Sequence, residues 1–100
     1  MNYEEISFGI ISYAGDAFAT LREAISAARN KNFEQADKLM QDAKKSLGEA
    51  HSVHTKLIVA EADGTKPEYS ILLSHAQDTM MNALLFETIT EEFIEMYKQK

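Results

Sequence analysis

The residues best suited to chemistry in this sequence lie together in the run Ser-His-Ala-Gln-Asp-Thr at positions 74–79. On an α-helix, which turns by about 100° per residue, Asp78 and Thr79 share a face with His75 and lie one turn further along. Gln77 points to nearly the opposite side. A neutral imidazole is a good nucleophile toward phosphorus near neutral pH, because its ring keeps a free nitrogen lone pair. A nearby carboxylate can orient the ring or raise its basicity, so the run predicts a nucleophilic histidine, although this spacing also arises on helices without a site.

A second candidate site is formed by His51 and His54, which are three residues apart, with Glu61 nearby. These side chains are possible metal ligands, but no further ligands follow at a spacing typical of zinc sites. The alternative is that His54 packs in a helix seam and His51 is solvated. The chain has no glycine-rich phosphate loop and no serine-histidine-aspartate arrangement that would indicate another kind of catalysis.

Three helical segments must position these groups. Turn-forming residues cluster only at residues 30–32 and 63–67, and no segment alternates as a strand does. Asn2 and Asn32 are candidate N-caps for helices over residues 3–29 and 33–62. Pro67 suits a first helical position, so we expect the third helix to run from there nearly to the end. The sequence predicts an all-α fold: a single domain, 1–100, folded as an antiparallel up-down-up three-helix bundle.

One stripe of the third segment does not suit a self-contained bundle, because it is apolar at both ends and polar in the middle. Its members are Ile71, His75, Asp78, Asn82, Leu85, Ile89, Phe93 and Met96. Other apolar residues lie on further sides of the same helix. A helix that is apolar over so much of its circumference needs partners on several faces, so we expect the chain to self-associate.

Charge and composition exclude several functional classes. The net charge is −6, which argues against nucleic acid and anionic membranes as partners. Residues 67–97 contain no Lys or Arg, so chemistry there takes place in a negative local field. Without cysteine the chain has no disulfides. No apolar run is long enough for membrane insertion and no signal peptide is recognisable, so we expect a cytoplasmic protein.

Motifs along the whole chain resemble the lactose/cellobiose-type enzyme IIA proteins of the bacterial sugar phosphotransferase system. The most specific is Leu-Leu-Ser-His-Ala-Gln-Asp at residues 72–78, which resembles the signature at the family's active histidine. The others are Tyr-Ala-Gly-Asp-Ala at 13–17, Asn-Phe-Glu-Gln-Ala at 32–36, Glu-Ala-His at 49–51 with Thr-Lys-Leu-Ile at 55–58, and Glu-Ala-Asp-Gly at 61–64. Thr79, Phe18 and His54 depart from the family pattern, which usually has His, a small or basic residue, and Gln at these positions.

The resemblance implies a homotrimer of three-helix bundles and a role as a phosphocarrier. His75 would accept a phosphoryl group from the histidine-containing phosphocarrier protein, HPr, and pass it to a cysteine of the cognate IIB component. The IIC component would then take up a β-linked disaccharide such as cellobiose, chitobiose or lactose. Ala76 in the signature slightly favours the cellobiose side. Asp78 would lie near the threefold axis and share one divalent cation per trimer with its symmetry mates.

Elementary electrostatics agrees with this metal site. Three carboxylates that meet at one axis repel one another, so they must bind a cation or take up protons. Oxygen ligands favour a hard ion such as Mg²⁺. The alternative is that Asp78 is simply exposed in a monomer. Two other functions stay open at this point, a non-enzymatic helical adaptor and a metal-binding bundle, while partner docking is expected near Met80 and Met81.

Overall fold

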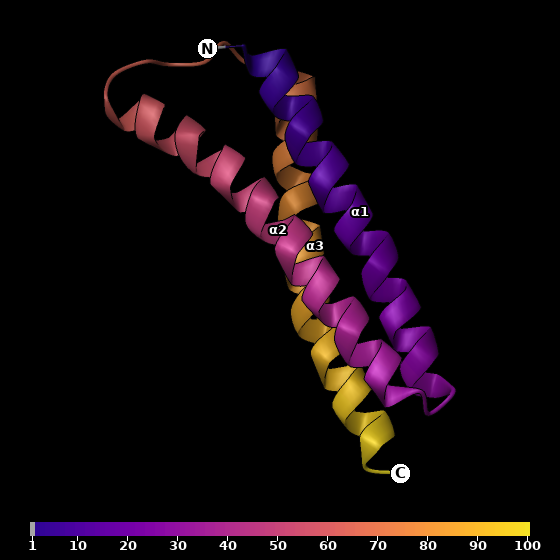
Figure 1. The fold of residues 1–100 in the computed structure, drawn as a ribbon. Helices are drawn as coiled ribbons and strands as arrows, with labels where there is room; N and C mark the ends of the chain where they lie inside the picture. Colours follow the sequence, from indigo (N-terminus) through magenta and orange to yellow (C-terminus); the bar gives the residue numbers. More distant parts are fainter. Residues whose placement is uncertain (1) are drawn as a thin grey trace.

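The computed structural model describes residues 2–100 and contains three helices: α1 (Tyr3–Arg29), α2 (Phe33–Ala62) and α3 (Ile71–Lys98). Helix α2 runs back alongside α1, and α3 returns in the direction of α1, so the two ends of the chain lie at opposite ends of a rod (Figure 1). The rod measures 51 × 19 × 17 Å. The predicted all-α, up-down-up bundle is confirmed.

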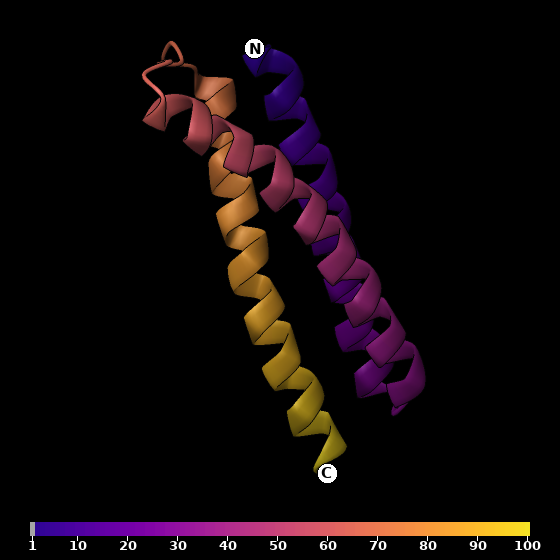
Figure 2. The same ribbon diagram turned by 60° about the vertical axis from the view of Figure 1, so that its left-hand side comes forward.

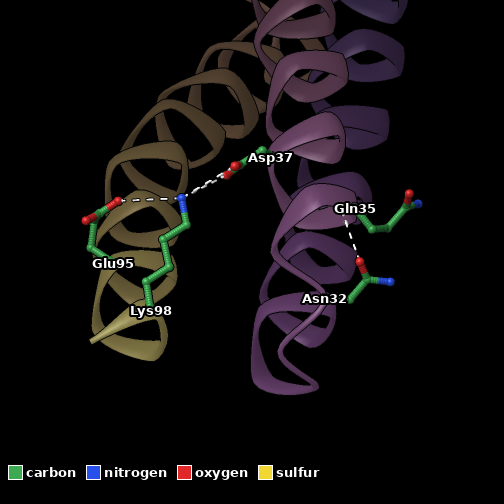
Figure 3. A network of polar contacts seen from close by, with 5 residues as sticks. All are labelled: Asn32, Gln35, Asp37, Glu95 and Lys98. Atoms are coloured by element: carbon green, nitrogen blue, oxygen red, sulfur yellow. Dashed lines mark hydrogen bonds and ion pairs between the residues drawn. The ribbon is translucent and has the colours of Figure 1, made fainter. Parts of the chain in front are cut away.

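Asparagine caps start the first two helices, as the sequence predicts. The Asn2 side chain accepts a hydrogen bond from the Glu5 backbone N–H at 3.0 Å. Asn32 accepts one from the Gln35 N–H at 3.3 Å, which Figure 3 shows at the base of α2. Each bond satisfies one of the free N–H groups of a first helical turn. The caps therefore fix where α1 and α2 begin.

The predicted start of the third helix at Pro67 is wrong, because α3 begins at Ile71. Ser70 is its N-cap and accepts a hydrogen bond from the Leu73 N–H at 3.3 Å. A proline is tolerated in a first turn but satisfies no N–H group there, whereas a serine hydroxyl does. Gly64, with φ of 99°, ends α2 in a conformation that favours glycine. Residues 65–70 are therefore a non-helical connection that leads to α3.

The core runs along the length of the rod and is built mostly from small and medium apolar side chains. On α2 the buried apolar residues recur at steps of three, four or seven residues: Ala36, Met40, Ala43, Leu47, Ala50 and Leu57. Helix α1 packs closely on both other helices, and α2 and α3 contact each other much less. Figures 1 and 2 both show the C-terminal end of α2 apart from the N-terminal end of α1.

Helix α3 turns a different face to the core from the stripe that the sequence singled out. Its buried residues are Leu73, Ala76, Met80, Ala83, Thr90 and Ile94. The whole stripe of Ile71, His75, Asp78, Asn82, Leu85, Ile89, Phe93 and Met96, called the outer face of α3 below, is exposed. Ile71 is 76% exposed and Leu85 60% exposed. The expectation that this stripe does not belong inside a single bundle agrees with the structure.

Among residues 2–100, no helix combines the length and the apolar character that crossing a membrane requires.

Candidate functional site

His75 lies near the start of α3 with its side chain exposed, and Asp78 is exposed one turn further along. The helix behind them is held in the core by Leu73, Ala76 and Met80, which are 8%, 0% and 2% exposed. Core side chains of this kind are close-packed, so the backbone that carries His75 has little freedom to shift. The structure thus presents an accessible imidazole on a firmly held helical turn.

Thr79 shares the face of His75, as predicted, but its hydroxyl is already engaged. Thr79 Oγ1 donates a hydrogen bond of 2.7 Å to the backbone carbonyl of His75. Such a bond to the carbonyl four residues earlier is common for threonine in helices. The hydroxyl is therefore engaged with the backbone of the turn that carries His75, and its proton is not directed at the imidazole ring.

Gln77, to which the sequence analysis gave no role, pairs with a histidine of α2. The distance from His54 Nε2 to Gln77 Oε1 is 2.9 Å, and both side chains are partly buried. His54 is thus a packed seam residue with a hydrogen-bond partner, and His51 is exposed, as the non-metal alternative expects. This pair could not be found from a local motif, because it depends on how α2 and α3 are aligned against each other.

No cluster of three or more His, Cys, Asp or Glu side chains within residues 2–100 could hold a metal ion. His51, His54 and Glu61 therefore do not form a metal site within one chain, and the metal-binding alternative loses its proposed ligands. Asp78 supplies a single exposed carboxylate. A divalent cation needs several oxygen ligands, so Asp78 fits such an ion only if copies from other chains converge on it.

The ion pairs between α2 and α3 lie further along α3 than His75. Lys44 Nζ is 2.6 Å from Glu91 Oε1, and hydrogen bonding to Glu91, opposed by burial, raises the Lys44 pKa. Lys98 lies between Asp37 of α2 and Glu95, at 3.3 and 3.9 Å (Figure 3). None of the ion pairs formed by residues 2–100 includes Asp78 or His75. The lysines of these ion pairs, Lys44 and Lys98, are thus paired elsewhere and do not neutralise a phosphoryl group on His75.

The expected docking residues Met80 and Met81 have opposite environments. Met80 is 2% exposed and packs in the core, so its assignment to a docking surface is wrong. Met81 is 57% exposed and remains a candidate. The error arose because both methionines lie in one apolar run, while the helix turns by about 100° between them.

Comparison with known proteins assigns the chain to a family. The family model described as "PTS system, Lactose/Cellobiose specific IIA subunit" matches residues 5–98. The chain belongs to this family. As a PTS IIA protein it is a phosphotransferase component of the sugar phosphotransferase system, which confirms the resemblance found in the sequence.

Individual relatives match over nearly the whole chain. The lichenan-specific phosphotransferase enzyme IIA component of Bacillus subtilis strain 168 is 42% identical, over 96% of this chain and 87% of its own length. The cellobiose-specific enzyme IIA of Bacillus anthracis superposes with a TM-score of 0.96 at 40% identity, covering 99% and 91% of the two chains.

One relative has been solved in complex with a protein partner. The solution structure of the IIA(chitobiose)–HPr complex from the Escherichia coli phosphotransferase system matches with a TM-score of 0.85 at 32% identity. It covers 99% of this chain and 96% of its own. These comparisons concern whole chains, so the individual roles of His75 and Asp78 stay predictions.

Proposed function

We propose that this PTS IIA protein carries a phosphoryl group on His75, accepting it from HPr and passing it to a cysteine of the cognate IIB component. The observation that carries the proposal is the exposed imidazole of His75 beside the fully buried Ala76, within the sequence Ser-His-Ala-Gln-Asp. The Escherichia coli relative has been solved in complex with HPr, which supports the same donor here. The site of action would then be the cytoplasm.

The transfer uses two successive displacements at phosphorus. A ring nitrogen of His75, Nε2 by family resemblance, attacks the phosphohistidine of HPr, so that one P–N bond forms as the other breaks and the HPr imidazole leaves. A cysteine thiolate of IIB then attacks the phosphorus, a P–S bond forms, and the His75 imidazole leaves once its nitrogen is protonated. Neutralisation of the phosphoryl charge falls to backbone dipoles, another subunit or a cation of the docked partner.

We also propose that the chain assembles as a homotrimer through the outer face of α3. Leu85, Ile89, Phe93 and Met96 expose 60%, 39%, 40% and 58% of their surface, in line along one helix. Soluble monomers rarely leave such a continuous apolar patch uncovered. Around a threefold axis, the copies of these four side chains would cover one another, while His75, near the start of α3, would lie at the edge of the contact and stay accessible.

Such an assembly would bring three Asp78 carboxylates together around one divalent cation, Mg²⁺ by the hardness of its oxygen ligands. The cation would cancel repulsion among the carboxylates and so stabilise the assembly. Asp78 lies on the outer face, which is the surface that would meet its copies. The phosphoryl chemistry proposed for His75 does not pass through this ion.

The sugar is expected to be a β-linked disaccharide of the cellobiose, chitobiose or lactose type. The names of the relatives support this class, since they include lichenan, cellobiose and chitobiose components. This subunit does not recognise the sugar in the proposed scheme, because IIC does so during transport.

Incubation with phosphoenolpyruvate, enzyme I and HPr tests the proposal. Intact-mass measurement should show one acid-labile phosphoryl group per chain, which is lost on addition of IIB. The gain should disappear in His75→Ala and persist in the control His51→Ala, which changes an exposed histidine on α2. If the chain is only a helical adaptor, the wild-type protein gains no mass, and that result rejects the phosphocarrier function.

A further inference from the structure

The His54–Gln77 pair ties α2 to α3 next to the proposed phosphorylation site. The bond spans 2.9 Å between His54 Nε2 and Gln77 Oε1, and both side chains are partly buried. An amide oxygen only accepts, so the imidazole donates from a protonated Nε2. Such a directional bond fixes which side of α3 faces α2, whereas apolar burial is non-directional.

Gln77 and His75 project from nearly opposite sides of the same helical turn. A helix behaves as a rigid unit over one turn, so a tie at Gln77 sets the direction in which His75 projects. With its side chains a helix has a radius of about 5–6 Å, and a rotation of about 20° therefore moves a side-chain end by about 2 Å. Errors of about 1 Å in the alignment of reacting groups can cost on the order of a hundredfold in rate.

The other polar ties between α2 and α3 are poorly placed to do this. Lys44–Glu91 and Lys98–Asp37 join the helices further along α3, and their side chains are 34% to 58% exposed. Exposed ion pairs of this kind contribute little in water. Contact between α2 and α3 is also less extensive than the contact of either helix with α1. In the first turns of α3, Leu73, Ala76 and Met80 hold the helix in the core, and the Gln77–His54 bond adds a directional contact that sets its rotation relative to α2.

We propose that His54 is a positioning residue for phosphoryl transfer: by holding Gln77 from α2, it sets the direction in which α3 presents the His75 imidazole. The proposal rests on the proposed function of His75 as phosphoryl acceptor. His54 itself does not touch the phosphoryl group, since Gln77 lies on the far side of the turn.

Single-turnover transfer from phosphorylated HPr, measured over a range of HPr concentrations, tests this role. His54→Leu removes the donor, and we expect the first-order rate at saturating HPr to fall roughly tenfold to a hundredfold, with the half-saturating HPr concentration unchanged. His54→Gln keeps an N–H donor and should restore most of the rate. Gln77→Leu should match His54→Leu, and the double variant should be no slower than either.

A matched control separates positioning from general stability. Lys44→Met breaks a different α2–α3 tie, and it should leave the rate at the wild-type value. The proposal is overturned if His54→Leu transfers at the wild-type rate. It is also overturned if the transfer rates of His54→Leu and Lys44→Met fall in proportion to their losses in free energy of unfolding, measured in urea.

A second readout does not depend on transfer. The ¹H–¹⁵N resonances of the His75 ring report its surroundings in the unphosphorylated protein, and they should move in His54→Leu and stay in place in His54→Gln and Lys44→Met. Unmoved His75 resonances in His54→Leu reject positioning even if transfer works. If the wild-type chain accepts no phosphoryl group, the proposed phosphocarrier function is rejected, and so is the proposed effect of His54 on the transfer rate.

Discussion

The Lys44 ammonium and the Glu91 carboxylate, 2.6 Å apart, link the middle of α2 to α3. Hydrogen bonding to Glu91 raises the Lys44 pKa above its ordinary value in the folded protein. A raised pKa means that the pair stabilises the fold fully below the unfolded pKa, and that this stability is lost as pH rises through the folded pKa. Both side chains are 46% exposed, so solvent screening keeps the contribution below about 1 kcal/mol.

We therefore expect Lys44→Met to be slightly less stable than wild type at neutral pH and equal to it at pH above the Lys44 pKa. Urea denaturation of both proteins across this range measures the difference. If the difference in free energy of unfolding between the two proteins grows as pH rises, the stabilising role of the Lys44–Glu91 pair is contradicted.

Thr90 should be a site where a small change stabilises the protein. Its side chain is fully buried, and its hydroxyl oxygen has no hydrogen-bond partner among residues 2–100. Thr90→Val keeps the shape and removes the unsatisfied polar group, so we expect the free energy of unfolding to rise by about 1 kcal/mol. Thr88→Val, at an exposed position two residues away, should stay within about 0.5 kcal/mol of wild type. A less stable Thr90→Val protein would mean that the hydroxyl has a partner after all.

Leu85 tests the proposed assembly. Because Leu85 is on the outer face and outside the core of the single bundle, Leu85→Lys should leave the helical content unchanged but shift the protein from trimer to monomer. Sedimentation velocity measures this shift. Ser52→Lys, which adds the same charge at an exposed position of α2, should remain trimeric. If Leu85→Lys sediments like wild type, the outer face is not the contact between subunits.

Asp78 tests the proposed cation. A cation held only by the assembled protein stabilises it by mass action, so a chelator should lower the melting temperature of wild type. Asp78→Asn has no carboxylates to repel one another, and its melting temperature should not respond to the chelator. An equal response in both proteins, or none in wild type, contradicts a shared ion at Asp78.

Much of the fold could be predicted because its signals are local. The caps at Asn2 and Asn32 and the helical spacing of apolar residues in α1 and α2 depend only on neighbours in the sequence. The start of α3 was misplaced because Pro67 and Ser70 both carry a helix-start signal. Only the hydrogen bond from the Leu73 N–H to the Ser70 hydroxyl decides between them.

The candidate site could be predicted only in part. His75 and Asp78 share a face through helical geometry alone, and the sequence was sufficient for that. Which apolar side of α3 faces the core could not be read from periodicity, because apolar residues such as Met80 and Met81 occur on several sides. The His54–Gln77 contact joins residues 23 apart in sequence, and it exists only in the packed register of α2 and α3.

Localisation of the phosphoryl group tests directly whether His75 is its acceptor. The wild-type chain is phosphorylated by phosphoenolpyruvate, enzyme I and HPr, digested under alkaline conditions that preserve phosphohistidine, and sequenced by tandem mass spectrometry. We expect a single modification, on His75, with His51 and His54 unmodified. A phosphoryl group on either of those two histidines, or on none of the three, contradicts it.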